Sequence, residues 1–167
     1  MAGCQYKGKS FGSCTITIDI KQNSNGTLRV EGQNPGEGSP TTLLTTDVVV
    51  GGNGHWTPTG TFHASHWEHD HVSTQHLPHE SVPYSKSITG DNAFGPYQLH
   101  ILELESRGIY IHGTIGPSWN PFTVLNSLVS PTSHGCVRMS NLHNVELHNM
   151  MSNPKGNLII IKMDAAR

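Results

Sequence analysis

Charged and aromatic side chains are scarce in this chain of 167 residues. Only 13% of the residues are Asp, Glu, Lys or Arg, and 7% are aromatic, whereas charged residues make up about 25% of an average globular protein. The 10 basic and 12 acidic residues leave a net charge of −2, so no basic excess indicates a nucleic-acid partner. The longest aliphatic run, Leu158 to Ile161, is far shorter than the ~18 residues of a membrane span. We therefore expect neither nucleic-acid binding nor a membrane span.

The N-terminal residues lack the pattern of a secretion signal. Residues 1–7 contain no basic segment followed by an apolar one. We therefore expect no secretion signal in residues 1–167. A protein with this sequence that works outside the cytoplasm would have lost its signal beforehand or be exported without one.

Cysteine is rare as well, with three residues in the chain. Cys4 and Cys14 are close enough in sequence to form a small loop-closing disulfide in an oxidising compartment; two reduced thiols are the open alternative. An odd number of cysteines leaves at least one without an intramolecular partner. Cys136 is the one with no obvious mate, which makes it a candidate for chemistry.

Residues that favour turns and strands are abundant, including 18 Gly and 10 Pro. Residues 14–20 alternate strictly between isoleucine and polar side chains, which predicts a half-buried strand. An Asn-Gly turn then leads into a returning strand around Leu28 and Val30. Further strands are expected at residues 41–50, 98–105, 109–112 and 158–163. One helix is expected at residues 142–151, capped by Ser140 or Asn141 and ended by Asn153 and Pro154.

These patterns predict a mainly β fold, either a β-sandwich or a closed β structure, with one notable helix. We expect a single domain over residues 1–167, because no repeat or linker divides the chain. Residues 1–40 would form an N-terminal hairpin and loop. Residues 63–86 are polar, rich in histidine and without a period, so we expect a long loop insert there.

The segment around Cys136 carries the strongest chemical signal. The cysteine follows Gly135 and stands between His134 and Arg138, and positive charge nearby favours the reactive thiolate. A cysteine nucleophile needs a general base, and His112 follows a predicted strand and precedes a glycine. If the Nδ1 atom of His112 donates to a backbone carbonyl, its Nε2 atom is left to take the cysteine proton. Residues 109–141 are therefore the predicted catalytic segment.

Four motifs give this sequence a family resemblance. The sequence reads Ile-His-Gly-Thr at residues 111–114 and Ser-His-Gly-Cys-Val-Arg-Met-Ser-Asn at residues 133–141. Together these resemble the signature of the L,D-transpeptidase catalytic domain of bacterial cell-wall enzymes. Thr-Pro-Thr-Gly-Thr-Phe at residues 57–62 and Phe-Gly-Pro-Tyr at residues 94–97 are also similar to family segments. The resemblance covers residues 41–162, although the stretch from residue 113 to 132 is longer than the family usually has.

The resemblance implies a β-sandwich of the L,D-transpeptidase type, with the helix after the catalytic cysteine. It also implies an enzyme that acts on peptidoglycan stem peptides. Cys136 would attack the bond between the diamino acid and D-alanine of a tetrapeptide stem, with His112 as the base and the Gly113 carbonyl orienting it. The thioester would pass to an amine, giving a 3→3 cross-link or D-amino-acid exchange, or to water, as in a carboxypeptidase. The residues that would line the substrate site and the oxyanion hole are Ser133, His134, Gly135, Arg138 and Asn141.

The same resemblance implies a location in the periplasm or cell envelope. A second interpretation keeps the chemistry but changes the biology: an antibacterial effector that acts on a rival's cell wall. Such an effector would have a cognate immunity protein as a partner.

The histidines form the least explained pattern. Seven of the 12 lie between His55 and His79, and imidazole-rich tracts bind zinc, copper or nickel. The weak candidates for metal ligands are His66, His69 and His71. Because no zinc-protease helix motif is present, we expect no metal and no cofactor in the main interpretation. A zinc-dependent peptidase that uses the histidine cluster is the alternative from another class.

Overall fold

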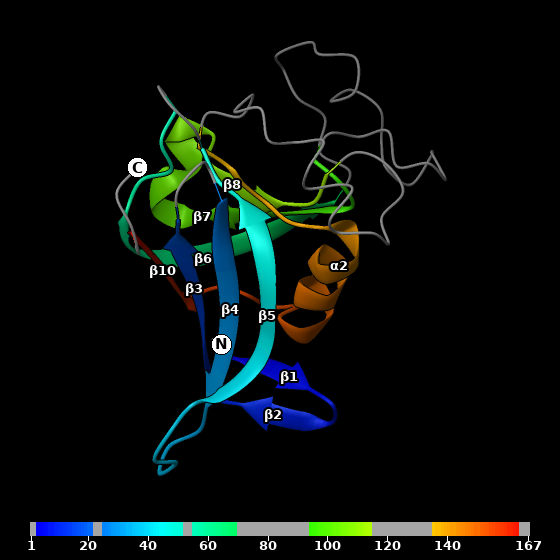
Figure 1. The fold of residues 1–167 in the computed structure, drawn as a ribbon. Helices are drawn as coiled ribbons and strands as arrows, with labels where there is room; N and C mark the ends of the chain where they lie inside the picture. The colour runs from blue at the N-terminus through cyan, green and yellow to red at the C-terminus, as the bar shows by residue number, and fades with distance from the viewer. Residues whose placement is uncertain (1–2, 22–24, 52–54, 70–93, 115–134, 164–167) are drawn as a thin grey trace.

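The computed structural model describes residues 3–21, 25–51, 55–69, 94–114 and 135–163, and these form a mainly β fold (Figure 1). Among the described residues, no helix has both the length and the apolar character to cross a membrane. The strands are β1 (Cys4–Tyr6), β2 (Lys9–Phe11), β3 (Ser13–Ile20), β4 (Asn25–Gln33), β5 (Thr41–Val49), β6 (Gly60–His69), β7 (Tyr97–Ile101), β8 (Tyr110–His112), β9 (Val137–Arg138) and β10 (Leu158–Met163); the helices are η3 (Leu102–Arg107) and α2 (Asn141–Met150).

The strands from β3 to β10 are hydrogen-bonded into a closed barrel in the order β10-β3-β4-β5-β9-β8-β7-β6. The ring closes where β10 pairs with β6 in the antiparallel direction. The mainly β fold predicted from the sequence is confirmed, and the described strands close into a ring. Two pairs are parallel, β10 with β3 and β8 with β9. The second of these pairs positions the candidate site.

Strand β3 shows how the sequence builds the barrel. Its three isoleucines are at most 1% exposed, while the polar residues between them are at the outer face. On the antiparallel neighbour β4, Leu28 lies opposite Ile18 and Val30 lies opposite Ile16. Burying such apolar side chains is the main driving force for closing the sheet. The strand and the returning strand predicted from alternation are both confirmed.

A small sheet precedes the barrel. Strands β1 and β2 pair with each other, joined by Lys7 and Gly8, which both have positive φ angles, 48° and 79°. The sequence did not reveal this hairpin, because three-residue strands are too short to show alternation. A disulfide joins Cys4 in β1 to Cys14 in β3, with a Cα–Cα distance of 6.0 Å. Of the two alternatives for these cysteines, the structure has the disulfide.

The structure differs from prediction on both sides of residues 70–93. Residues 63–69 of the predicted loop insert belong to strand β6, and residues 70–86 lie outside the described residues. In β6 only Ala64 is fully buried, so the strand lacks an apolar face in its sequence. The strand predicted at 98–105 ends at Ile101. The next residues form the 3₁₀ helix η3, which buries Leu104 and ends at Gly108 with a φ of 67°.

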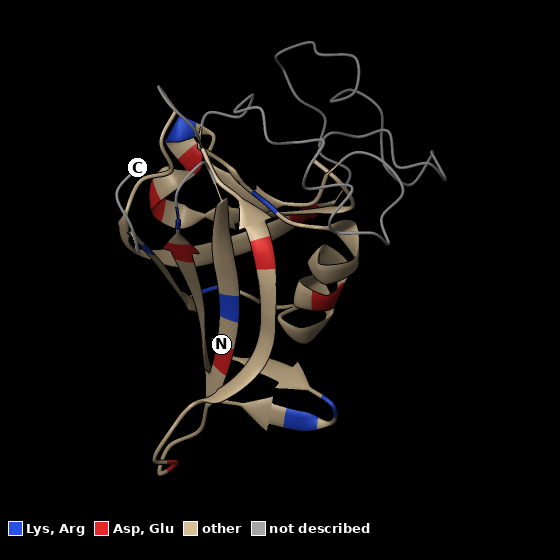
Figure 2. Cartoon of the chain, in the orientation of Figure 1, with Lys and Arg blue, Asp and Glu red and all other residues tan. Residues whose placement is uncertain are grey.

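The predicted helix is confirmed. Helix α2 begins and ends one residue earlier than predicted, and helix ends are assigned only to within one or two residues. Ser140 is its N-cap, and the Ser140 hydroxyl oxygen accepts a hydrogen bond from the backbone N–H of His143 at 3.3 Å. The helix begins almost directly after β9 and packs Leu147 and Met150 into the core. In Figure 2 the charged residues are dispersed over separate elements of the described chain rather than gathered by sign.

Candidate active site

Strands β8 and β9 bring the two residues of the predicted chemistry to one face of the barrel. In this parallel pair, Ile111 lies opposite Val137 and His112 lies opposite Arg138. Because side chains alternate along a strand, His112 and Arg138 share one face, while Ile111 and Val137 enter the core. Cys136 directly precedes β9 and is on the His112 face. Strand spacing and rise place the Cα atoms of Cys136 and His112 about 8 Å apart, which the two side chains are long enough to bridge.

The Cys136 side chain is buried, and the backbone at the start of β8 holds its sulfur. The Sγ atom accepts a hydrogen bond from the Tyr110 backbone N–H at 3.3 Å. The thiol donates to the carbonyl oxygen of Gly108 at 3.4 Å.

The His112 ring is oriented by its own neighbour in sequence. Its Nδ1 atom lies 2.6 Å from the carbonyl oxygen of Gly113. Because a carbonyl only accepts hydrogen bonds, Nδ1 carries the proton, and Nε2 is the basic nitrogen of the neutral ring. The ring is 1% exposed and meets the edge of Phe94 at a centroid distance of 5.0 Å. This is the ring orientation that a general base for Cys136 requires.

Asn141 holds the segment that follows His112. Its side-chain nitrogen donates to the Thr114 carbonyl, and its side-chain oxygen accepts from the Thr114 N–H, both at 2.8 Å. Gly113 has no side chain for a physical reason: a Cβ atom there would meet the Asn141 side-chain oxygen. Gly95, with a φ of 68°, approaches the same segment closely. Asn141 was predicted to line the substrate site, but both ends of its buried amide are bonded to backbone.

Thr57 holds the segment that precedes Cys136. Its side chain is 0% exposed, and its hydroxyl donates to the Gly135 carbonyl at 2.7 Å while accepting from the Gly51 N–H at 2.8 Å. Gly135 has a φ of 101°, which favours glycine. Sequence analysis noted the motif at 57–62 only as a resemblance. Its first residue is a link between the end of β5 and the residue before the cysteine.

The remaining predicted site residues are Arg138, Ser133 and His134. Arg138 is 7% exposed in the centre of the sheet, where its strand pairs with Val49 of β5 on one side and with His112 of β8 on the other. Its charge is therefore close to the site but shielded from bulk solvent. Ser133 and His134 lie outside the described residues.

Gln98 is a site residue that sequence reasoning missed. It lies opposite His112 in the β7–β8 pair and is 1% exposed. Neither its amide nitrogen nor its amide oxygen makes a hydrogen bond within the described part of the chain. Buried amides are nearly always bonded, so one left unpaired opposite His112 among the described residues makes Gln98 a candidate functional position. The available signal was a glutamine directly before the buried Leu99 in β7.

Tyr110 was missed as well. It lies on the same face of β8 as His112, two residues earlier. Burial raises the pKa of Tyr110 above its ordinary value, and the negative charges of Cys136, Glu68 and Glu105 raise it further. The phenol therefore remains protonated at neutral pH and lies within the electrostatic field of the cysteine.

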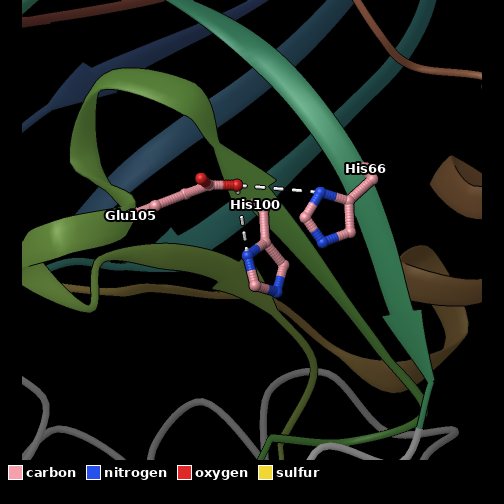
Figure 3. A group of neighbouring side chains, drawn as sticks. All are labelled: His66, His100 and Glu105. Atoms are coloured by element: carbon pink, nitrogen blue, oxygen red, sulfur yellow. Dashed lines mark ion pairs between the residues drawn. The ribbon is translucent and has the colours of Figure 1, made fainter.

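The structure does not unite the three histidines considered as metal ligands. His66 and His69 are three residues apart on β6, which places them on opposite faces of an extended strand. The His69 ring packs instead against Tyr97, with centroids 5.2 Å apart, and His71 lies outside the described residues. His66 meets a different group, His100 and Glu105, which Figure 3 shows.

Fold and site together define a class of protein: a β-barrel domain that presents a cysteine and a histidine on neighbouring parallel strands. The sequence matches the L,D-transpeptidase catalytic domain over residues 15–161. The chain belongs to this family, as the motifs indicated. Both Cys136 and His112 lie within the matched range.

Solved structures show the same fold. An L,D-transpeptidase from Stackebrandtia nassauensis is 21% identical with a TM-score of 0.54, and the match covers 95% of this chain and 58% of that one. L,D-transpeptidase 1 from Mycobacterium tuberculosis is 20% identical with a TM-score of 0.52, covering 89% and 60%. A Clostridium acetobutylicum protein described as a fused zinc-dependent amidase/peptidase/peptidoglycan-binding domain-containing protein is 16% identical with a TM-score of 0.54, covering 89% and 51%. At such identities the likeness concerns the fold alone.

This chain therefore spans between 51% and 60% of the length of these three solved chains. No curated protein matches the chain.

Proposed function

We propose that this chain catalyses L,D-transpeptidation of peptidoglycan through a thioester on Cys136. The substrate is a tetrapeptide stem, and the bond broken joins its diamino acid to the terminal D-alanine. The family match supports a peptidoglycan peptide as substrate. The observation that carries the proposal is the Nδ1 contact of His112 with Gly113, because it puts the proton of the neutral ring on Nδ1 and makes Nε2 the basic nitrogen.

The reaction begins with movement of one proton. The Cys136 thiol turns from Gly108, gives its proton to Nε2 of His112 and attacks the carbonyl carbon of the diamino acid. The tetrahedral intermediate collapses, the C–N bond to D-alanine breaks, and the leaving amine takes the proton back from His112. An acceptor amine then attacks the thioester, which forms the new amide and restores the thiol.

Backbone N–H groups before β9 are proposed to stabilise the oxyanion. The candidates are the N–H groups of Cys136 and Gly135. The Gly135 carbonyl is fixed by Thr57, which supports a pre-organised peptide at this position; pre-organised donors are what an oxyanion hole needs. Ser133 and His134 stay predicted contacts of the substrate.

Gln98 and Arg138 are proposed to recognise the stem peptide. The Gln98 amide is unpaired among the described residues and lies across the strand pair from His112, so a peptide group of the donor would satisfy it. The Arg138 guanidinium supplies a shielded positive charge on the same face, suited to holding either the loop before Cys136 or a substrate carboxylate.

A role on peptidoglycan places the working enzyme in the periplasm or cell envelope. The same chemistry serves an effector that attacks a rival's wall, which would have an immunity protein as its partner. The acceptor decides between cross-linking, D-amino-acid exchange and hydrolysis, and the product mixture of the experiment below distinguishes the three.

The test incubates the protein with a disaccharide-tetrapeptide and measures release of D-alanine by mass spectrometry. Cys136→Ala removes the nucleophile, so we expect release to fall by about 10³-fold or more. Cys136→Ser, which keeps the side-chain volume, controls for packing and should also be inactive. Release that continues unchanged in both variants would contradict the mechanism. Loss of release with a chelator and not with the variants would instead favour the zinc peptidase.

A further inference from the structure

Three side chains that the proposed reaction does not use converge at the edge of the site. They are His66 of β6, His100 of β7 and Glu105 of η3 (Figure 3), and one ligand atom from each lies within 4.8 Å of the others. The Oε1 atom of Glu105 is 3.4 Å from Nδ1 of His100 and 3.6 Å from Nδ1 of His66. The two imidazole rings stack with centroids 4.1 Å apart. We refer to these three residues as the His-His-Glu cluster.

One carboxylate oxygen in the cluster lacks the bonds that its burial requires. Glu105 Oε1 is shielded from solvent and accepts no hydrogen bond from the residues that the structure describes. Both imidazole nitrogens lie beyond the 2.7–3.2 Å range of ordinary N–H···O bonds. A shielded anionic oxygen without partners is costly. A cation between the three ligand atoms would satisfy it.

The His100 ring is already oriented as a metal ligand. Its Nε2 atom lies 3.0 Å from a carboxylate oxygen of Glu68, and because a carboxylate accepts, Nε2 carries the proton of the neutral ring. Its Nδ1 lone pair then faces Glu105. A carboxylate on the far nitrogen of a ligating histidine is the usual outer shell of a zinc site.

The spacing of the ligand atoms also suits a small cation. Zinc binds nitrogen and oxygen ligands tetrahedrally at about 2.0–2.1 Å, which places neighbouring ligand atoms about 3.3–3.4 Å apart. The distances to Glu105 are 3.4 and 3.6 Å. The stacked rings must tilt for both nitrogens to converge. The His66 side chain is 58% exposed, so it is able to turn and exchange its 2.9 Å contact with the Ser65 hydroxyl for the ion.

We propose that the His-His-Glu cluster binds one divalent transition-metal ion of the zinc type. Two imidazoles and one carboxylate suit zinc, nickel or copper rather than calcium or magnesium, which prefer oxygen alone. The exposure of His66 leaves a coordination position open to solvent. The proposal does not depend on the transpeptidase reaction, because it concerns binding of the metal.

The cluster lies in one row with the nucleophile. His100 is paired with Tyr110 across β7 and β8, and their rings are 4.6 Å apart. The Tyr110 backbone in turn donates to the Cys136 sulfur. An ion in the cluster would therefore place positive charge near the cysteine, with Tyr110 as the one residue that contacts both His100 and Cys136.

Equilibrium dialysis of the purified protein against zinc chloride, with the bound metal counted, tests the proposal. The wild type should bind at least one stoichiometric equivalent. His66→Ala and Glu105→Gln should each bind one equivalent of zinc fewer than the wild type. Glu68→Gln should lower the zinc affinity of the same site about 10–100-fold. His63→Ala and His69→Ala are the matched controls, because each removes one imidazole from the same strand outside the cluster. Both should retain every equivalent.

Two further measurements keep the result unambiguous. Thermal melting of each metal-free variant checks that the barrel is intact. Because the His66 side chain is exposed, we expect His66→Ala to stay folded. Cys136→Ser separates the cluster from direct binding of zinc to the thiol and should retain the equivalent. The proposal is wrong if the wild type binds no stoichiometric zinc, if His69→Ala loses the equivalent and His66→Ala does not, or if only Cys136→Ser loses it.

Discussion

The two sides of the barrel use the same strand alternation for different purposes. On the outer face of β3 and β4, charged residues satisfy one another: Arg29 bonds to Glu31 at 2.8 Å and to Asp19 at 3.5 Å. The bond with Glu31 holds the pKa of Arg29 above its ordinary value. On the outer face of β7 and β8, polar residues are buried instead, and Gln98 is not bonded to any described residue.

This difference separates residues that stabilise the barrel from residues that use it. A paired charge on a partly exposed sheet face contributes little free energy, and each charge has its partner. A buried polar group without a partner costs free energy, and a stable barrel tolerates that cost where the group serves binding or catalysis. The comparison predicts that substitutions on the β7–β8–β9 side change activity more than stability, and that substitutions on the β3–β4 side do the opposite.

His112→Gln should have the largest effect on activity. The substitution removes the base that accepts the Cys136 proton, so D-alanine release should fall by about 10²–10⁴-fold. The matched control is His148→Gln, which removes an imidazole stacked on Tyr97 at 3.7 Å, away from the cysteine face, and should keep wild-type release. Equal activity losses in the two variants would show that the effect is not specific to His112.

Thr57→Val tests the link that Thr57 makes between Gly51, after β5, and Gly135, before the cysteine. The valine keeps the volume but loses the hydroxyl, so the Gly51 N–H and the Gly135 carbonyl lose their shared partner. Each buried group left unpaired costs about 1–3 kcal/mol, which should appear in denaturant unfolding. Activity should fall too, because Gly135 directly precedes the nucleophile. Thr57→Ser keeps the hydroxyl and should restore most of both. A valine variant that is stable but as active as the wild type would contradict a positioning role.

Ile18→Ala tests the opposite side. Ile18 is 0% exposed in β3, and truncating a buried isoleucine costs about 2–5 kcal/mol of the free energy of unfolding. At a temperature where the variant stays folded, kcat/KM for D-alanine release should equal that of the wild type. The half-buried Thr15→Ala on the same strand is the milder control and should change both quantities much less. A large change in kcat/KM for Ile18→Ala would remove the distinction between the two sides.

A fold element or site residue was predictable from the sequence where the neighbouring residues themselves form a recognisable pattern. Strand β3 was predictable because isoleucines repeat at every second position, and helix α2 because Ser140 caps it and Pro154 follows it. The cysteine and the histidine were predictable because their motifs are contiguous. The orientation of His112 by the Gly113 carbonyl was implied by the family resemblance, and the structure has this contact.

The remaining features depend on contacts between distant segments. Strand β6 has one fully buried residue, so its polar sequence resembles a loop until β10 and β7 pair with it. Thr57 meets Gly135 across 78 positions, and no local pattern reveals such a partner. The His-His-Glu cluster likewise draws on three elements. Its one member within the histidine-rich tract is His66; of the partners predicted for it, His69 lies on the opposite face of β6 and His71 lies outside the described residues.

Gln98→Leu should have the smallest effect on activity. It tests whether a buried polar residue on the β7–β8 side serves substrate binding rather than stability. Leucine has nearly the volume of glutamine but no polar atoms. Because the Gln98 amide makes no hydrogen bond with the described residues, replacing it removes a burial cost without losing a bond. The free energy of unfolding should stay the same or rise by up to about 1 kcal/mol.

KM for the stem peptide should rise about 5–10-fold if the amide binds the donor, since one hydrogen bond is worth about 1 kcal/mol. Arg29→Leu is the contrasting control on β4 and should leave KM unchanged. A Gln98→Leu variant that loses stability and keeps its KM would place Gln98 among the residues that hold the barrel together.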